Sequence, residues 1–364
     1  MIIGIDASNI RTGGGRKHLK NFISKSLDEF KNIKFILVSN SYMNSQFINE
    51  TRVLCISNFL LNFNSILSLF SQLFYSNHYF TSNKCDIVFV PGGVFFSNFK
   101  PFVSMSQNML PFDKLELNRF RLMKRIKFSL LKILQTNTFK RSEGVIFLTD
   151  YAKSNILNQI GNVKSSAVIP HGIKQQNKNN YKPNTGCFEI LYISDFLPYK
   201  HQFNVTKSIV ELINEGYNIN LTLIGEKDKF QLKLIKKLLD ENKNIRSRIK
   251  IKGKLSYSYI PKFLETSSLF LFASSCENLP FIMLEAISYG LPIITTNKKP
   301  MKDMVNGENI LFDSSNVNSI KKTVKNNLNH EKLIKMSKIN FLNSKNYTWD
   351  LNIIRTINYL KSCT

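Results

Sequence analysis

Short apolar runs recur along the chain, separated by segments long enough to form a helix. In the first half they lie at residues 2–5, 35–38, 53–56, 87–90, 102–105, 145–148 and 167–169. In the second half they lie at 189–193, 219–224, 249–252, 269–272 and 292–295. Runs this short and apolar throughout are typical of parallel strands buried on both faces. The alternation therefore predicts an α/β protein with two doubly wound, Rossmann-like sheets.

The length of 364 residues also favours two domains, because single cores rarely grow beyond ~300 residues. We expect a first domain over 1–173 and a second over 187–346. Residues 174–186 are rich in Asn, Gln and Lys and are predicted to be a linker. Apolar residues at helical spacing in 347–364 predict a closing helix that packs back on the first domain. The two sheets would face a central cleft at the carboxyl ends of their strands, where such sheets bind ligands.

The charge of the chain is strongly positive, with 50 basic and 25 acidic residues. Such a balance attracts nucleic acid, anionic lipid or phosphorylated metabolites, although solvated surface lysines account for it equally well. The five cysteines show no C-x-x-C pair, which favours a reducing, cytoplasmic location. Residues 2–6 resemble a buried strand more than a secretory signal. The most apolar stretch, 59–75, is interrupted by polar residues, so no membrane span is expected.

Three consecutive glycines follow the first predicted strand and precede a helical pattern over 17–30. Glycines let the backbone approach a ligand closely, and the start of a helix attracts an anion. Gly14 and Gly15 are therefore candidate residues for binding an anionic ligand, with a flexible turn as the equally supported alternative. The motif is neither G-x-G-x-x-G nor a Walker A loop, so the usual dinucleotide and kinase fingerprints are missing.

A second candidate site follows the predicted strand 269–272. Glu277 lies in the loop, Pro280 suits the first turn of a helix that extends to residue 289, and Glu285 lies one to two turns into that helix. Free N–H groups between the two carboxylates can receive a diphosphate, and carboxylates accept strong hydrogen bonds from sugar hydroxyls. On spacing alone, an exposed loop glutamate and a helix glutamate that form a surface pair are the simpler interpretation.

The segment from Glu277 to Glu285 resembles the E-x7-E signature of retaining glycosyltransferases of family 4, which have the GT-B fold. Other stretches resemble that family in the same order: 168–173, 198–201, 223–225, 286–294 and 306–312. Residues 89–93 and 108–112 further resemble members that assemble bacterial surface polysaccharides such as O-antigen. The resemblance covers nearly the whole chain and is strongest in its second half.

The resemblance implies a role for each matching residue. Glu277 would bind the transferred sugar or support charge at its anomeric carbon, Glu285 would hold the ribose, and Lys200 would neutralise the departing diphosphate. The residues between the two glutamates that would contact the donor are Asn278, Leu279, Pro280 and Phe281. The first domain would bind the acceptor and the second the nucleotide sugar. Transfer would proceed by front-side displacement, without a protein nucleophile.

The chain contains no D-x-D pair, so we expect no metal and no cofactor other than the nucleotide-sugar donor. Two departures from the family pattern affect the charge of the site. Asp195 stands where members often have an arginine. The positive charge of that arginine would have to be supplied by another residue, such as Arg16 or Lys254. Asn108 lies near the place of a histidine that many members carry. Arg16 and Asn108 are the acceptor-side candidates, while His171 is expected to be a structural hinge residue.

Basic residues alternate with leucines and isoleucines between positions 114 and 141, which predicts an amphipathic helix with a cationic surface. Such a helix suits an anionic membrane, and a helix packed on the sheet with solvated lysines is the alternative. We expect peripheral association with the inner face of the plasma membrane, where 59–75 could also dock.

The function expected from these features is transfer of a hexosyl group from a nucleotide-diphosphate sugar to a saccharide acceptor, carried on a polyprenyl diphosphate. GDP-mannose and UDP-sugars are both open as donors. A GT-B nucleotide-sugar epimerase or hydrolase is the nearest alternative, and a glycan-binding module without turnover is another. A basic nucleic-acid-binding protein is a third, although the chain shows no nucleic-acid-binding motif.

Overall fold

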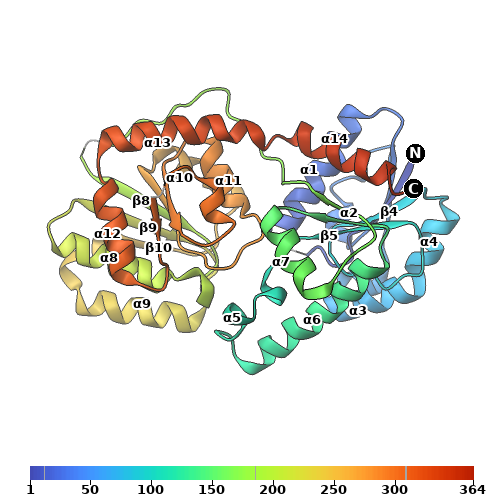
Figure 1. Cartoon of the computed structure of the whole chain (residues 1–364), viewed down its shortest axis with the longest axis horizontal. Coiled ribbons are helices and arrows are strands. Elements are labelled where there is room, and N and C mark those ends of the chain that lie inside the picture. The colour runs from blue at the N-terminus through green and yellow to red at the C-terminus, as the bar shows by residue number, and fades with distance from the viewer. Residues whose placement is uncertain (12, 185, 308–309) are drawn as a thin grey trace. The chain divides into compact units, whose positions relative to one another are not determined.

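The computed structural model describes residues 1–11, 13–184, 186–307 and 310–364. The chain forms two compact units (Figure 1). The first unit comprises Met1–Lys114, Leu122–Gly172 and Thr348–Thr364. The second comprises Leu115–Arg121 and Ile173–Tyr347. The segment Leu115–Arg121 was predicted within the first domain, but its contacts group it with the second unit.

The first unit contains a seven-stranded, wholly parallel sheet in the order β3-β2-β1-β4-β5-β6-β7. Its strands are β1 (Ile2–Asp6), β2 (Lys34–Val38), β3 (Val53–Ile56), β4 (Ile87–Val90), β5 (Phe102–Ser106), β6 (Gly144–Phe147) and β7 (Ser166–Val168). The helices before β5 are α1 (Gly13–Glu29), α2 (Ser41–Asn44), η1 (Phe59–Asn62), α3 (Ser65–Ser71), η2 (Gln72–Ser76) and α4 (Asn77–Ser82). Those after it are η3 (Leu110–Phe112), α5 (Lys114–Leu117), α6 (Leu122–Arg141), α7 (Asp150–Ile160) and α14 (Trp349–Lys361). All seven strands predicted from the apolar runs are confirmed.

The second unit contains a six-stranded parallel sheet in the order β10-β9-β8-β11-β12-β13. Its strands are β8 (Phe188–Ile193), β9 (Ile219–Ile224), β10 (Ile249–Lys252), β11 (Leu269–Phe272), β12 (Ile293–Thr296) and β13 (Leu311–Phe312). Its longer helices are α8 (Gln202–Asn214), α9 (Lys229–Glu241), α10 (Ile260–Thr266), α11 (Phe281–Ser288), α12 (Val317–Asn327) and α13 (His330–Asn343). The 3₁₀ turns within its described residues are η4 (Pro198–Lys200), η5 (Lys243–Arg248), η6 (Tyr257–Tyr259), η7 (Met301–Met304) and η9 (Ser344–Asn346). Only the two-residue strand β13 was absent from the prediction.

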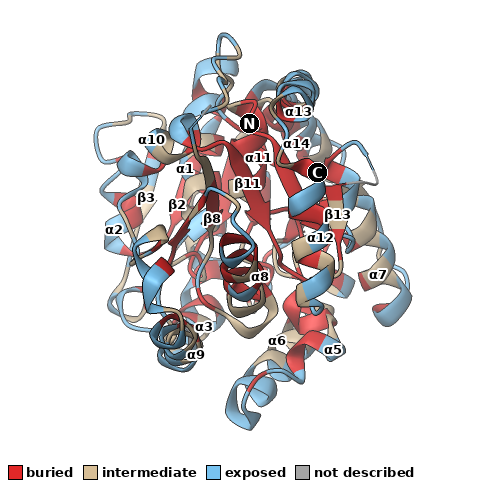
Figure 2. Cartoon of the chain, turned by 90° about the vertical axis from the view of Figure 1, so that its left-hand side faces the viewer, coloured by how far each residue is buried: buried red, intermediate tan, exposed pale blue. Residues whose placement is uncertain are grey.

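Burial follows the pattern expected of doubly wound sheets. The strands are buried, whereas many helices present an exposed surface on the side away from the sheet (Figure 2). In β4 and β11 every residue is buried, as continuous apolar runs in a parallel sheet require. The two sheets therefore form the cores of the two units, and the loops at their strand ends are free to carry polar side chains.

Helix α1 begins earlier than the spacing of apolar residues predicted. Its first residue is Gly13, so the glycines form the first helical turn instead of a separate loop before residue 17. Gly13 has φ of 61°, a conformation that glycine adopts without strain. Thr12, the first residue of this motif, lies outside the described residues.

The segment predicted as a linker, 174–186, is anchored to the second unit. The Asn179 amide donates to Ser337 Oγ at 2.9 Å, and the Tyr181 hydroxyl donates to the Ser268 carbonyl oxygen at 2.8 Å. The prediction of a linker missed these contacts, because their partners lie far along the chain. Thr185 lies outside the described residues.

Helix α14 packs within the first unit. The Asn352 amide donates to the Pro170 carbonyl oxygen at 2.6 Å, and Trp349 lies so close to Gly172 that a Cβ there would be 2.6 Å from the Trp349 Cα. His171 is buried beside His18, with their Nδ1 atoms 3.1 Å apart. The last helix thus returns to the sheet that the first residues of the chain begin.

Candidate functional site

The order of strands in the second unit reverses between β8 and β11. Strand β8 pairs with β9 on one side and with β11 on the other. The chain therefore leaves the carboxyl ends of β8 and β11 in opposite directions, and such a switch point is where open α/β sheets generally bind ligands. Lys200 follows β8, and Glu277 follows β11. The topology thus places both predicted residues at one switch point.

Lys200 ends the 3₁₀ turn η4 and is buried. Its carbonyl oxygen accepts a hydrogen bond from the hydroxyl of Tyr192, which is itself buried in β8. Its ammonium lies 5.1 Å from the Tyr199 ring centroid and 5.3 Å from that of Phe272. The backbone contact and the two rings hold the cation in place at the carboxyl edge of the sheet.

The Lys200 ammonium forms a short ion pair with the Glu277 carboxylate, and both side chains are largely buried. Burying a charge without a partner raises the free energy of the folded state, so each group stabilises the other in its buried position. An ammonium has three donor hydrogens, so the pairing leaves Lys200 able to donate to a further anion. This arrangement can accept a phosphate next to a carboxylate.

A second link joins the same two loops. His201 has φ of 52°, and its Nε2 hydrogen-bonds with Ser275 Oγ at 2.9 Å. The Ser275 backbone N–H donates to the Tyr199 carbonyl oxygen at 2.9 Å. Burial, with a further contribution from the positive charge of Arg119, lowers the pKa of His201 to about 4. His201 is therefore neutral at physiological pH and serves to fix the loops.

Glu285 lies on the inner face of α11 and is buried. The Tyr257 hydroxyl donates to Glu285 Oε1 at 2.6 Å, which orients the carboxylate. A helix was predicted to begin with Pro280 in its first turn and to extend to residue 289. Pro280 is instead the N-cap of α11, which ends at Ser288, and the helix residues from Met283 to Ser288 are buried. A carboxylate held in this way on a packed helix can accept hydrogen bonds from a ligand hydroxyl.

The segment between the two glutamates is tightly packed. Asn278, Leu279 and Pro280 are buried, and Phe281 is half-buried at the first position of α11. The structure thus brings Lys200 into contact with Glu277. The other candidates of the second unit follow Glu277 along the chain: Asn278, Leu279, Pro280, Phe281 and Glu285. The first turn of α11 adds backbone N–H groups and the positive end of a helix dipole.

Asp195 has a structural partner at the same sheet edge. Its Oδ1 accepts from the Glu226 backbone N–H at 2.9 Å, and the Glu226 carboxylate lies 3.2 Å from the Lys254 ammonium. A Cβ at Gly225 would lie 2.0 Å from the Ser194 carbonyl oxygen, so only glycine fits there. Lys254, one of the two cations considered as a replacement for the missing arginine, is thus near the site but already paired.

The candidates of the first unit lie at the carboxyl edge of its own sheet. Gly14 and Gly15 are in the first turn of α1, and the Arg16 Cζ is 4.3 Å from the Tyr42 ring centroid. Asn108 follows β5, and its Oδ1 accepts from the Leu110 backbone N–H at 3.0 Å. Arg16 and Asn108 each have local structural contacts, and their acceptor-side roles remain predictions.

Among the residues that the structure describes, no group of three or more His, Cys, Asp or Glu side chains is arranged to hold a metal ion. Sequence reasoning missed Tyr257, His201 and Ser275 as parts of the site. Tyr257 lies 28 residues before Glu285 and His201 lies 74 before Ser275. His201 falls within the stretch 198–201 that resembles the family, but no local pattern indicates these contacts, because only the packing of the sheet brings the partners together.

Comparison with known proteins finds a family match within the second unit. Residues 173–340 match the family model described as Glycosyl transferases group 1. The chain is 27% identical over 196 residues to Protein CapJ of Staphylococcus aureus, covering 53% of this chain and 48% of that protein. It is 26% identical over 164 residues to the Staphylococcus aureus capsular polysaccharide biosynthesis glycosyltransferase CapH, covering 43% of this chain and 44% of CapH. The chain thus spans about half the length of the curated relatives it matches.

The likeness to solved structures extends over both units. The Anabaena protein Alr3699/HepE, solved in complex with UDP and glucose, superposes with a TM-score of 0.71 at 14% identity and covers 99% of each chain. Both units are parallel-sheet, Rossmann-like α/β domains, which is the architecture of GT-B glycosyltransferases. The fold class predicted from the sequence is therefore confirmed.

Proposed function

We propose that the protein is a retaining, metal-independent glycosyltransferase that moves a hexosyl group from a nucleotide-diphosphate sugar to a glycan acceptor. The observation that carries this proposal is the Lys200–Glu277 pair at the switch point of the group 1 unit. A cation paired with a carboxylate, followed along the chain by a helix N-terminus and a second oriented carboxylate, suits the diphosphate, ribose and sugar of such a donor.

Each residue has a distinct part in the proposed reaction. Lys200 and the first turn of α11 stabilise the negative charge that develops on the departing diphosphate. Glu285 holds the ribose, with its orientation fixed by Tyr257. Glu277 accepts hydrogen bonds from the sugar hydroxyls and supports positive charge at the anomeric carbon. The acceptor hydroxyl attacks that carbon from the face that the diphosphate leaves, and a phosphate oxygen takes its proton.

The acceptor class follows from two supporting observations. CapH is named for capsular polysaccharide biosynthesis, so a growing surface glycan is the proposed acceptor here. Helix α6 exposes Lys124, Arg125 and Lys127, which suits an enzyme working on a glycan carried by a membrane lipid such as a polyprenyl diphosphate. We therefore include peripheral association with an anionic membrane surface in the proposal. No helix among the described residues is both long and apolar enough to cross a bilayer.

Thermal stabilisation by nucleotides tests the donor site. The purified protein is heated with UDP, GDP and their sugar conjugates, with and without EDTA, beside Glu285→Ala. Stabilisation by one nucleotide series, unaffected by EDTA and weakened in the variant, is the expected result. No shift with any nucleotide, together with a salt-sensitive shift with DNA, would overturn the proposal in favour of nucleic-acid binding.

Product analysis separates transfer from the nearest alternative. The stabilising nucleotide sugar is incubated with a lipid-linked saccharide acceptor, and the products are resolved by mass spectrometry and by NMR of the anomeric proton. Retention of the donor's anomeric configuration in a lengthened saccharide is expected. Free sugar or an epimerised donor, formed equally well without acceptor, would identify an epimerase or hydrolase instead.

A further inference from the structure

The helical segment formed by α3, η2 and α4 has its polar face inward and its apolar face outward. Four polar residues of the segment are fully buried: Ser68, Ser71, Gln72 and Ser76. The apolar residues exposed on it are Ile66, Phe70, Leu73, Phe74 and Tyr75, joined by Phe59 of η1 and by Phe63, the residue after η1. We call these seven residues the aromatic face. In a water-exposed helix the two faces are normally the other way round.

The inward polar face is explained by a buried carboxylate. Asp6, at the carboxyl end of β1, accepts from Gln72 Nε2 at 2.9 Å and from Ser76 Oγ at 3.1 Å. Gln72 also donates to the Val94 carbonyl oxygen at 3.0 Å. Turning the helix to bury its aromatic residues would leave Asp6 without these donors, at a high desolvation cost. The outward orientation of the aromatic face is therefore fixed by the core of the unit.

The aromatic face carries no charge of its own. No Asp, Glu, Lys or Arg occurs between Val53 and Asn83, although 21% of the whole chain is charged. The exposed fractions reach 67% for Phe74 and 72% for Phe59. Apolar side chains exposed together in this way indicate a surface that binds a membrane or another molecule.

Helix α6 supplies cations beside an apolar surface. Its buried residues, Gln135, Thr138 and Phe139, all lie in the C-terminal half. The N-terminal half exposes the apolar side chains of Leu122, Met123, Ile126 and Leu130, and it also exposes Lys124, Arg125 and Lys127. The helix is thus anchored at one end and presents a mixed apolar and cationic surface at the other.

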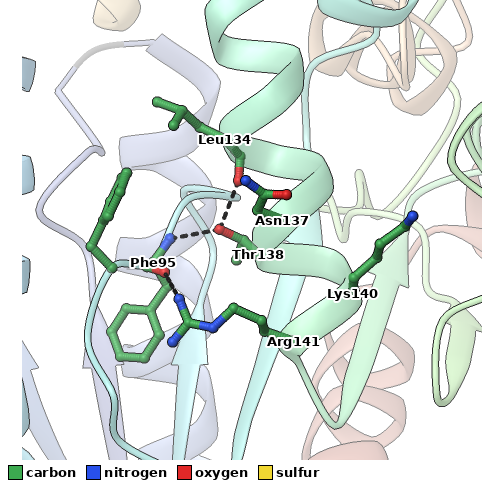
Figure 3. A pocket seen from close by; sticks show the side chains of 7 residues that line it. Phe95, Leu134, Asn137, Thr138, Lys140 and Arg141 are labelled. Atoms are coloured by element: carbon green, nitrogen blue, oxygen red, sulfur yellow. Dashed lines mark hydrogen bonds between the residues drawn. The ribbon is translucent and has the colours of Figure 1, made fainter.

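The loop 94–97 connects the aromatic face to α6. The Phe96 backbone N–H donates to Gln72 Oε1 at 3.3 Å, and the Phe95 N–H donates to Thr138 Oγ1 at 3.0 Å. Arg141 donates to the Ser97 carbonyl oxygen at 2.8 Å. A pocket of about 270 Å³ lies between this loop and α6, lined by aromatic and basic side chains (Figure 3). One loop therefore holds both helical segments, which lie along the same edge of the unit (Figure 1).

We infer that the aromatic face inserts into the interfacial region of an anionic bilayer while the cations of α6 contact the lipid headgroups. The chemistry of the surface matches that occupant, because a bilayer interface offers acyl chains to exposed rings and phosphates to nearby ammonium and guanidinium groups. The inference deepens the membrane association included in the proposed function. It assigns the insertion to a defined set of side chains, with α6 providing electrostatic attraction.

Vesicle flotation tests the inference. The full chain is mixed with vesicles of phosphatidylcholine containing phosphatidylglycerol, or of phosphatidylcholine alone. We expect flotation with the anionic vesicles and about a hundredfold weaker binding for the double variant Phe70→Ser/Phe74→Ser, at about tenfold for each ring removed. Phe230→Ser is the control, because Phe230 is a phenylalanine on α9 of the other unit whose exposed fraction, 59%, lies between those of Phe70 and Phe74, 48% and 67%. The control should float like the unmodified protein.

Fluorescence locates the inserted face directly. Trp349 is the only tryptophan and is buried, so the unmodified protein gives a background that lipid does not quench. In Phe74→Trp, vesicles of brominated lipid should quench the added indole, whereas in Phe230→Trp they should not. Arg125→Glu/Lys127→Glu should weaken binding to anionic vesicles and remove most of its salt dependence.

Three results would overturn the inference. They are absence of flotation by the unmodified protein, equal flotation of Phe70→Ser/Phe74→Ser, and a concentration-dependent dimer that this variant abolishes without any vesicle binding. The last would assign the face to contact between two copies. Nucleotide-induced thermal stabilisation is measured on the same samples. If the variant loses vesicle binding but is still stabilised by nucleotide, it is folded and the loss is specific to the membrane surface. If the unmodified protein binds vesicles but no nucleotide stabilises it, only the proposed donor site is contradicted.

Discussion

The ammonium of Lys200 contacts the carboxylate of Glu277 across the switch point between β8 and β11. The two residues are 77 positions apart in sequence and come from loops that leave neighbouring strands. The pair is largely buried, so each charge depends on the other for compensation. The two side chains therefore act together, because replacing either one leaves the charge of the other without compensation.

Replacing Lys200 tests the electrostatic part of the proposed reaction. In Lys200→Ala we expect the transfer rate at saturating donor to fall about 10²–10³-fold, because a preorganised contact to the departing diphosphate is lost. Lys200→Arg, which keeps the charge but not the geometry, should recover only part of the rate. Lys262→Ala removes an exposed lysine of α10 and is the control. An unchanged rate in a folded Lys200→Ala protein would contradict this role.

Tyr257 is expected to position Glu285. Tyr257→Phe removes the 2.6 Å hydrogen bond to Glu285 Oε1 and should weaken the affinity for the nucleoside diphosphate about fivefold, which corresponds to roughly 1 kcal/mol. Isothermal titration calorimetry measures this change. Tyr259→Phe alters an exposed tyrosine of the same 3₁₀ turn and should bind normally. Equal affinities for both variants would show that Glu285 needs no such support.

The His18–His171 contact predicts an acid-sensitive first unit. Burial lowers the pKa of His18 to about 4 from 6.5, and burial together with the neighbouring His18 imidazole lowers the pKa of His171 well below its ordinary value. The unfolded chain therefore binds more protons than the folded one below pH 6.5, so stability falls as the pH drops toward 4. For His18 the loss is about 3 kcal/mol over this range.

Denaturant unfolding at several pH values measures this effect. His18→Phe should flatten the pH dependence, since its ring can occupy the buried site without taking up a proton. His78→Gln, at an exposed histidine of the same unit, should leave the pH dependence unchanged. A slope that persists unaltered in His18→Phe would assign the acid sensitivity to other groups.

Gly225 is expected to tolerate no side chain. Its φ is 156°, and an added Cβ would lie 2.0 Å from the Ser194 carbonyl oxygen and 2.9 Å from the Asp195 nitrogen. Gly225→Ala must displace the loop that leads from β8 to Lys200, at a cost of about 3 kcal/mol or more. Gly216→Ala has a positive φ but no nearby atoms and should cost about 1 kcal/mol. Melting temperatures distinguish the two, and similar values would contradict the steric argument.

The strands of both sheets could be predicted from the sequence, because the pattern of a strand buried on both faces lies within a few consecutive residues. A run such as Leu269–Phe272 is apolar at every position, and no tertiary information is needed to recognise it. The start of α1 was placed four residues too late, since glycine carries no side chain to extend the apolar pattern. Strand β13 is only two residues long and leaves no periodicity to detect.

By itself, the sequence determined the two parallel sheets and the candidate residues that follow β8 and β11. Both depend on consecutive residues, namely an apolar run and the loop directly after it. Tertiary structure alone decided that Lys200 meets Glu277 and that Tyr257 meets Glu285, since these contacts depend on the strand order. It also decided which way the segment 65–82 faces. Its apolar residues would ordinarily be buried, but the buried carboxylate of Asp6 requires the polar face and leaves the aromatic one outside.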